Sequence, residues 1–352
     1  MLQIVGSCDQ RLFGLTPAER LRRQWAGGGE LVLVAAASAV LGDSALAWLK
    51  ENPGVALETD GGRAVAVAVP ASAAEQAARS IGEGVAGEQS VCASALGEVF
   101  VRKLRRRERL LARSLDEGRV AAVEKELFDS VYKGVTDLVT KYVWPLPAYW
   151  VTKLCARLHV HPNAVTLVGM VAMVAATLLW VEGELVAGMA FAWLMTFLDT
   201  VDGKLARVTV TSSQVGNLLD HVTDVIHPPI WWAALAYALA SRPGEVGAEP
   251  IWRALGVILV GYVVGRLIEA WAKFRMGFNP FLWRPFDSTF RTIVSRRNLI
   301  LLIMTIGLAA GAPEKAFIAA AGWALISVGI QLLRLVQAEL ARRRGTLSSW
   351  LA

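Results

Sequence analysis

The chain has little cysteine, no sign of a secretory leader and no internal repeat. Its three cysteines, Cys8, Cys92 and Cys155, are scattered among 352 residues, which excludes a disulfide framework and a closely spaced metal site. They fit a reducing compartment. The first ten residues, MLQIVGSCDQ, lack a basic start and a long apolar core, so we expect no signal peptide. The missing repeat argues against a transporter built from two related halves.

Charged residues are scarce as well, at 19%, whereas hydrophobic residues make up 55% of the chain. The mean hydropathy of +0.45 lies well above the average of soluble proteins. Thirteen tryptophans fit a membrane protein, because tryptophan favours the interface between water and lipid. The net charge of +6 then indicates basic loops that face the cytoplasm and anionic lipid, and we expect no nucleic-acid partner.

The length suggests two domains, and the composition changes near residue 128. Residues 1–97 indicate a small soluble α/β domain, in which buried strands are predicted at 31–40 and 64–69. Helices are predicted between and after these strands, at 17–25, 43–51 and 72–82. Alternation of strands and helices is typical of an α/β unit.

Residues 98–142 connect this domain to the hydrophobic part of the chain. The charged stretch 98–127 predicts a linker helix whose arginines and lysines face solvent or lipid headgroups. The amphipathic stretch 128–142, which is followed by several aromatic residues, predicts a helix lying along the membrane interface. On this helix, Lys133 and Asp137 either meet an anionic headgroup or belong to a solvated face.

Six hydrophobic stretches follow, each near the ~17–25 residues that a membrane-spanning helix needs, although the fifth is short. They are residues 164–181, 185–205, 214–240, 251–272, 298–312 and 315–337. We therefore expect an α-helical integral membrane protein with six transmembrane helices over 143–340. The small soluble α/β domain precedes this membrane domain, and a basic tail at 341–352 follows it.

Lysine and arginine gather at one set of membrane ends. The loop between the fourth and fifth spans holds six of them, and Arg342, Arg343 and Arg344 follow the sixth span. The loops at the opposite ends have almost none. Because basic loops stay in the cytoplasm, we expect an inner or plasma membrane protein with the α/β domain and both termini on the cytoplasmic side.

Four aspartates interrupt the hydrophobic region, and their spacing is informative. Asp199 and Asp202 lie near the end of the second span, while Asp220 and Asp224 lie near the start of the third. Residues three or four apart share one face of a helix, so a short connection lets all four carboxylates converge at the cytoplasmic edge. A carboxylate at the centre of a membrane helix costs about 2.5–3.5 kcal/mol, which favours a functional role.

Crowded carboxylates repel each other, and divalent cations remove that repulsion. All-oxygen ligands favour Mg²⁺ or Mn²⁺, and two such ions held close together would clamp a phosphoryl group. Three small residues nearby, Gly203, Ala206 and Gly216, leave room for a ligand, and Arg207 can hold phosphate oxygens. Together these residues indicate a site for a substrate that carries a pyrophosphate.

The whole pattern is Asp199-x2-Asp202-Gly203-x2-Ala206-Arg207-x8-Gly216-x3-Asp220-x3-Asp224. It resembles the motif of the CDP-alcohol phosphotransferase (phosphatidyltransferase) family at every position, and the resemblance covers about 128–340. Members of this family transfer a phospho-alcohol from a CDP-alcohol to a second hydroxyl and release CMP. The resemblance therefore implies a transferase of phospholipid or headgroup biosynthesis, with a CDP-alcohol donor, a hydroxyl acceptor and membrane lipid as partners. It also allows a homodimer.

The resemblance assigns roles to the motif residues. Asp199, Asp202 and Asp220 would hold two Mg²⁺ or Mn²⁺ ions, and Asp224 would contact the second ion and act as general base on the acceptor hydroxyl. The CDP pocket would be lined by Asp199, Gly203, Ala206, Arg207, Gly216, Asn163 and Thr166. The last two match family positions near the nucleotide, but either could instead cap a helix.

Three candidates for the acceptor site lie outside the motif, and each has two interpretations. His221 and His227 could orient a metal-binding aspartate or touch the acceptor, or they could be ordinary packed histidines. Arg266 could bind a phosphate of the acceptor, or it could pair with Glu269 one helical turn away.

The N-terminal domain resembles the nucleotidyltransferase-like domain that precedes this membrane module in inositol-phosphate cytidylyltransferase/di-inositol-phosphate synthases. The resemblance rests on GLTPAERL at 14–21 and on the α/β pattern. A working nucleotidyltransferase needs a glycine-rich G-x-G-T-R loop and a lysine after its first strand, and QIVGSCDQRLFGLTPAERL has neither. We therefore expect a non-catalytic domain with a structural, regulatory or partner-binding role.

The substrates stay open at this point. The donor is either CDP-diacylglycerol, with a small polyol or polyol phosphate as acceptor, or a soluble CDP-polyol, with a lipid or polyol as acceptor. The fused N-terminal domain favours inositol-like chemistry. The alternative functions are a non-catalytic scaffold that keeps the enzyme fold and an ion-coupled transporter. The transporter is disfavoured because the acidic cluster lies at one membrane end.

Overall fold

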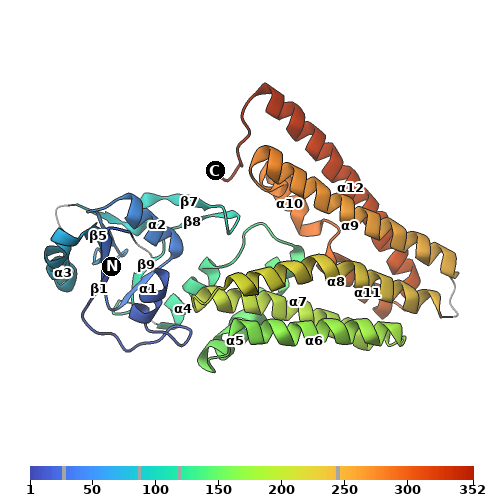
Figure 1. The fold of residues 1–352 in the computed structure, drawn as a ribbon, viewed down its shortest axis with the longest axis horizontal. Helices are drawn as coiled ribbons and strands as arrows, with labels where there is room; N and C mark the ends of the chain where they lie inside the picture. The colour runs from blue at the N-terminus through green and yellow to red at the C-terminus, as the bar shows by residue number, and fades with distance from the viewer. Residues whose placement is uncertain (26–28, 86–88, 118–119, 243–245) are drawn as a thin grey trace. The chain divides into compact units, whose positions relative to one another are not determined.

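The computed structural model describes residues 1–25, 29–85, 89–117, 120–242 and 246–352 (Figure 1). The backbone divides into two compact units. The first unit contains Met1–Gly134, Tyr149–His161 and Lys204–Ser212, and the second contains Val135–Ala148, Pro162–Gly203 and Ser213–Ala352. Each unit has its own hydrophobic core and is described by itself.

A five-stranded mixed sheet forms the centre of the first unit (Figure 1). Its strands, in spatial order, are β1 (Leu2–Val5), β2 (Leu31–Ala36), β5 (Ala64–Pro70), β4 (Ala56–Glu58) and β6 (Ser90–Cys92). The pairs β1–β2 and β4–β6 are parallel, and the two pairs that involve β5 with β2 and β4 are antiparallel. The strand predicted at 31–40 is wrong in extent, because the chain turns at 37–38 and its last residues form the separate strand β3 (Ala39–Leu41), whereas β2 and β5 match the rest of the prediction. Their runs of valine and alanine are buried on both faces, which is why they lack an alternating pattern.

The three predicted helices of this unit are confirmed. They are α1 (Pro17–Gln24), α2 (Asp43–Glu51) and α3 (Ala74–Glu83), the last preceded by the 3-10 turn η1 (Ala71–Ala73). Helix α1 begins at a capping box: the Thr16 hydroxyl accepts a hydrogen bond from the Glu19 amide, and the Glu19 carboxylate accepts one from the Thr16 amide. Proline at the first helical position supports the same start.

The expected linker helix over 98–127 is wrong for its first half, which is β structure. Strands β7 (Glu98–Val101) and β8 (Arg106–Arg109) form an antiparallel hairpin after the short turn η2 (Ala93–Leu96). Strand β9 (Ala112–Ser114) then pairs with β3 (Ala39–Leu41). Leu110 and Leu111 are buried between these strands, so tertiary burial outweighs the helix propensity of the charged residues. The α/β unit therefore extends well past residue 97.

The expected single interfacial helix over 128–142 is also wrong. Helix α4 (Val120–Ser130) ends within the first residues of the stretch, and helical structure resumes only near the π-helical turn η3 (Val139–Val143), followed by α5 (Pro145–Arg157). Gly134 lies in the break, where an added Cβ would come within 2.9 Å of the Arg105 carbonyl oxygen. This close contact with the β7–β8 hairpin explains why the helix does not continue through 131–137.

The second unit consists of helices (Figure 1). They are η3, the start of α5, α6 (Pro162–Val181), most of α7 (Leu185–Val208), α8 (Gln214–Ala240), α9 (Ala248–Met276), η4 (Pro280–Leu282), α10 (Pro285–Ile293), α11 (Arg297–Ala309) and α12 (Pro313–Arg344). Large fully buried side chains, including Trp180, Trp231 and Phe317, form its core. The last turn of α7 belongs to the first unit, so one helix is shared by both.

Four of these helices are long and apolar enough to cross a membrane: α6, α7, α9 and α12. Helices α10 and α11 give a fifth candidate if they form one span, with a bend of 44° between them. The third expected span is helical, as α8, but its first turns carry two aspartates and two histidines. The fifth, at 298–312, is the short α11. The chain is thus a helical integral membrane protein with four or five candidate spans among its described residues, and the expected number of six is not confirmed.

Candidate functional site

Helices α7 and α8 carry the aspartate motif. Asp199 and Asp202 lie near the C-terminal end of α7, and Asp220 and Asp224 lie on the first turns of α8. The backbone of Asp220 is one helical turn before Asp224, but its side chain is outside the described part of the structure. Gly203 follows Asp202 directly, whereas Ala206 and Arg207 lie on the last turn of α7, in the first unit.

The start of α8 packs closely against the start of α6. Ser213 caps α8, and its hydroxyl accepts a hydrogen bond from the Gly216 amide at 3.0 Å. A Cβ on Gly216 would lie 3.0 Å from that hydroxyl and 3.1 Å from the side-chain oxygen of Asn163. Glycine therefore allows the close approach that the motif predicts, and the structure brings Asn163 and Gly216 together.

Thr166 contacts a motif aspartate directly. Its hydroxyl lies 2.6 Å from a carboxylate oxygen of Asp202, which is only 7% exposed. The same hydroxyl lies 3.2 Å from the carbonyl oxygen of Pro162. Thr166 is therefore more than a helix-capping residue, because it holds the orientation of a buried carboxylate between α6 and α7.

Arg297 is the functional residue that sequence reasoning missed. Its guanidinium donates to Asp199 at 2.6 Å and to Asp224 at 2.9 Å, so it joins the two helices of the motif. From the sequence, Arg297 is predicted only to be one of the six basic residues in the loop between the fourth and fifth spans. Its position at the first residue of an apolar helix, α11, was the available signal, since a charge there faces either solvent or a polar site.

His227 orients Arg297 from the other side. The histidine is 2% exposed, its Nδ1 lies 2.6 Å from the Thr223 carbonyl oxygen, and its ring packs edge-on against Trp231. Because Nδ1 must donate to that carbonyl, Nε2 is free to accept from the Arg297 guanidinium at 3.2 Å. His227 is thus placed beside the aspartates, whereas His221 lies on an exposed part of α8.

Arg266 approaches the site on α9. Its guanidinium donates to the backbone carbonyl of Asp224 at 3.3 Å and lies over the Tyr262 ring. The alternative pairing with Glu269 is not formed, because Glu269 pairs with Arg296. Two arginines, Arg266 and Arg297, therefore reach the position of the expected base.

Asp137 supports the site and is not part of a solvated face. Its carboxylate accepts hydrogen bonds from the Asn298 side chain at 2.9 Å and from the Thr140 amide at 3.0 Å. Burial opposes its charge, but these donors and the charge of Arg291 outweigh burial and hold the pKa of Asp137 below its usual range. Asp137 therefore fixes the residue next to Arg297, while Lys133 is exposed.

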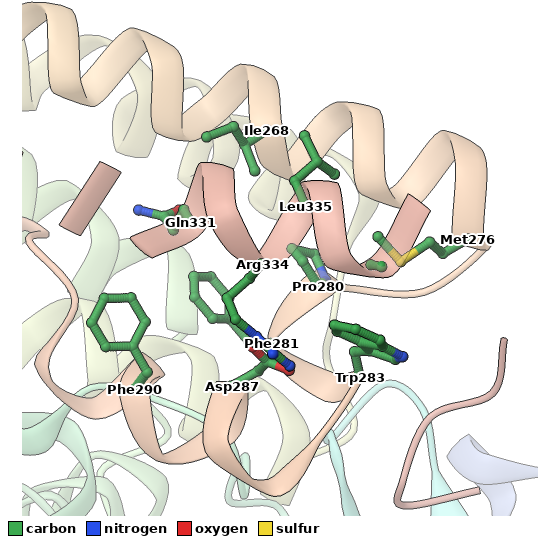
Figure 2. Close-up of a pocket in the computed structure, with 11 residues that line it drawn as sticks. Ile268, Met276, Pro280, Phe281, Trp283, Asp287, Phe290, Gln331, Arg334 and Leu335 are labelled. Atoms are coloured by element: carbon green, nitrogen blue, oxygen red, sulfur yellow. Dashed lines mark hydrogen bonds and ion pairs between the residues drawn. The ribbon is translucent and has the colours of Figure 1, made fainter. Parts of the chain in front are cut away.

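A hollow of about 380 Å³, open to solvent, lies apart from the motif (Figure 2). It is lined from α9, η4, α10 and α12 by largely apolar side chains, among them Phe281, Trp283 and Phe290. Its two charged lining residues pair with each other: Arg334 makes two hydrogen bonds to Asp287, at 2.6 and 2.8 Å. No residue of the aspartate motif is among its lining residues.

The carboxylates of Asp199 and Asp224 are suited to bind a divalent cation, because they are oxygen donors that point toward the same position. Among the side chains that the structure describes, no three histidines, cysteines or carboxylates are arranged as a metal site. However, Asp199 and Asp224 already point at one common cation, the Arg297 guanidinium. The donor atoms of the aspartates are oxygen, as Mg²⁺ and Mn²⁺ prefer, and the Nε2 of His227 lies beside the same guanidinium. The described residues are therefore suited to hold such an ion if the guanidinium moves aside.

Part of the chain matches a known protein family. Residues 159–330 match the model of the CDP-alcohol phosphatidyltransferase family. Phosphatidylinositol phosphate synthase of Mycobacterium marinum is 33% identical over 85 residues, which are 22% of this chain and 36% of that protein. Archaetidylinositol phosphate synthases of Pyrococcus horikoshii and Aeropyrum pernix are 33% and 35% identical over 79 and 88 residues. These matches cover 22% and 25% of this chain and 42% and 45% of those proteins.

The chain therefore spans less than half the length of each of these relatives. A solved structure, Mycobacterium tuberculosis phosphatidylinositol phosphate synthase with CDP-DAG bound, aligns with 22% identity and a TM-score of 0.42, over 53% of this chain and 92% of that one. Residues 159–330 thus match the model of the CDP-alcohol phosphatidyltransferase family, and the similar relatives are named as inositol phosphate lipid synthases. The matched segment begins after the α/β sheet and includes all four aspartates.

Proposed function

We propose that this protein transfers a phosphatidyl-type group from a CDP-diacylglycerol-like donor to the hydroxyl of an inositol phosphate-like acceptor, releasing CMP. One observation carries the proposal: Asp199 and Asp224, on separate helices, converge on a single cation beside the Thr166–Asp202 pair. The names of the three relatives support the substrates, because each specifies a product in which a lipid phosphate is joined to inositol phosphate.

The proposed metal ligands are the four aspartates of the motif, which would hold two Mg²⁺ or Mn²⁺ ions. Bound there, such ions would neutralise the pyrophosphate of the donor. The chain itself supplies the base, Asp224, whose carboxylate would take the proton from the acceptor hydroxyl as the hydroxyl oxygen attacks phosphorus and CMP leaves. The Thr166 hydroxyl keeps the Asp202 carboxylate in one orientation throughout.

Arg266 and Arg297 are the proposed contacts for a phosphate on the acceptor. Both guanidiniums reach Asp224, and guanidinium forks match phosphate oxygens in geometry and charge. This arrangement favours a phosphorylated acceptor over a neutral polyol. His227 would hold Arg297 on its Nε2 side, while the exposed His221 remains a weaker candidate for the acceptor site.

The proposed CDP pocket combines Asp199 with Gly203, Ala206, Arg207, Gly216, Asn163 and Thr166. The proximity of Asn163 and Gly216 supports it, since two of these residues already lie side by side. We further propose a cytoplasmic active site and cytoplasmic termini, from the basic loops, and a homodimer. The N-terminal unit is proposed to be a non-catalytic relative of nucleotidyltransferase domains.

The test is CMP release by the purified full chain, with Mg²⁺ or Mn²⁺ and CDP-diacylglycerol, comparing inositol phosphate with free inositol. We expect release with inositol phosphate, and a loss of about 100-fold or more in Asp224→Asn, as for removal of a general base. Glu249→Gln, an exposed carboxylate on α9, is the matched control and should keep full activity. Absence of CMP release from every CDP-alcohol would instead favour a non-catalytic scaffold.

A further inference from the structure

We infer that the N-terminal α/β unit positions the aspartate helix: α1 holds the C-terminal end of α7 through Arg20 and Arg23. The inference rests on the proposed function for the role of the aspartates. It gives a structural role to the N-terminal domain, which has no G-x-G-T-R loop for nucleotide transfer. All the contacts that carry it lie within the first unit.

The end of α7 needs support from outside the helix. The chain leaves the helix at Val210, whose φ of 53° lies in the left-handed region that favours glycine. The Thr211 amide bonds back to the Ala206 carbonyl at 2.9 Å, as in the usual closure of a helix by a left-handed residue. A β-branched residue is strained in this conformation, so the ending is poorly stabilised by its own sequence.

Two arginines of α1 supply that support. Arg20 donates to the carbonyl of Val208, and Arg23 donates to the carbonyl of Thr209 at 2.7 Å. The last carbonyls of a helix have no partner within it and carry its negative dipole end, so cationic donors stabilise them. Arg20 is 4% exposed, and burial lowers its pKa to about 10, against the opposing charge of Asp43. A buried arginine that faces helix carbonyls is a built contact, since an unpaired charge would be costly there.

A third contact holds α7 at Lys204, one helical turn before Val208. Lys204 is 3% exposed, and its ammonium donates to the Val131 carbonyl at 3.3 Å and lies over the Tyr132 ring. Lys204 is separated from Asp202 by Gly203 alone. The first unit therefore holds the segment from Lys204 to Thr209 by hydrogen bonds, and this segment begins two residues after Asp202.

These contacts at the end of α7 can set the position of Asp199 and Asp202 because an α-helix is stiff. Asp202 is six residues before Val208, which is about 9 Å along the axis at 1.5 Å per residue. A metal or phosphate site tolerates displacements of only about 0.5 Å. Fraying or rotation of the last turn would therefore be transmitted to the carboxylates of Asp199 and Asp202.

The test compares Arg20→Ala/Arg23→Ala with Arg22→Ala in the purified full chain. Arg22 is an exposed arginine on the same helix, so the control removes a similar charge without touching α7. The first readout is hydrogen exchange of the amides from 199 to 211. The second is Mn²⁺ binding followed by electron paramagnetic resonance. We expect faster exchange over this segment and a Mn²⁺ dissociation constant raised about tenfold, as for loss of an indirect support of metal ligands.

Arg23→Lys should restore most of the binding lost in Arg23→Ala, because lysine also donates to a carbonyl. If the double variant does not fold, Arg23→Ala alone carries the test, since Arg23 is exposed and its loss spares the core. Exchange and Mn²⁺ binding equal to those of Arg22→Ala would overturn the inference. Faster exchange confined to α1 would overturn it too. Neither readout requires CMP release, so a failure of the proposed reaction stays distinguishable from a failure of this inference.

Discussion

Arg297 and Asp199 form an ion pair, with Nη2 2.6 Å from the carboxylate oxygen, although 98 residues separate them in the chain. The same guanidinium reaches Asp224 at 2.9 Å, so one arginine balances the charge of one aspartate from each motif helix. The side chain of Arg297 is only 15% exposed, and such a charge is tolerated because it is paired. The pairing shows how the carboxylate cluster is held together by the chain's own residues.

Removing that guanidinium should destabilise the protein most when divalent metal is withheld. For Arg297→Ala in chelator, we expect a loss of about 2 kcal/mol, below the cost for a fully buried pair because Asp224 is 41% exposed. Added Mg²⁺ should recover part of the loss by neutralising the same carboxylates. Thermal unfolding in detergent, with and without Mg²⁺, measures both effects.

Arg253→Ala is the matched control for this measurement. Arg253 pairs with Glu249 at the surface, where both side chains are more than 70% exposed. We expect a change below about 1 kcal/mol and no dependence on Mg²⁺. An Arg297→Ala protein that unfolds like this control under both conditions would contradict the assigned role.

Thr166→Val should weaken the site without disturbing the helix that carries it. The substitution keeps the shape of the side chain but removes the hydroxyl that lies 2.6 Å from Asp202. We expect about a tenfold loss in activity or in metal affinity, the usual scale for a group that orients a ligand. Thr177→Val on the same helix removes only a hydroxyl bonded to the Met173 carbonyl, and its activity should match the wild type.

Gly216→Ala should interfere with the contact between α6 and α8. The new methyl group would lie 3.0 Å from the Ser213 hydroxyl and 3.1 Å from Asn163, so one neighbour must shift. We expect a raised KM for the CDP-alcohol with a small change in stability. Gly256→Ala, at a helix position with open space around it, should be neutral or stabilising by up to about 1 kcal/mol. Equal KM values for the two variants would exclude a role for Gly216 beside the nucleotide.

The α/β unit should lose one stabilising ion pair in acid. A hydrogen bond from Arg113 lowers the pKa of Asp60 below its usual range, despite opposing burial. A carboxyl with a lowered folded pKa stabilises the fold above its unfolded pKa of about 3.9, and this contribution disappears as the pH falls through the folded value. The difference in melting temperature between wild type and Asp60→Asn should therefore be largest near neutral pH and shrink as the pH falls below the unfolded pKa. A difference that persists unchanged in acid would argue against the pairing.

Local patterns predicted most helices and the buried strands because each signal lies within a few residues. The helix predicted at 43–51 is α2, and the valine-rich run at 64–69 is β5. The hairpin at 98–109 was missed for the opposite reason. Its arginines and glutamates favour a helix in isolation, and only pairing between β7 and β8 and the burial of Leu110 and Leu111 make it β structure.

The sequence by itself was enough to predict the candidate site: four aspartates, two on one face of each of two helices, with small residues around them. Helical spacing is a local property, so it needs no knowledge of the fold. The tertiary structure decided which other groups meet those carboxylates: Thr166 on Asp202, Arg297 between Asp199 and Asp224, and, at the end of the same helix, Arg20 on Val208 across 188 residues. Contacts over such separations depend on how each unit packs, which no spacing rule along a single helix contains.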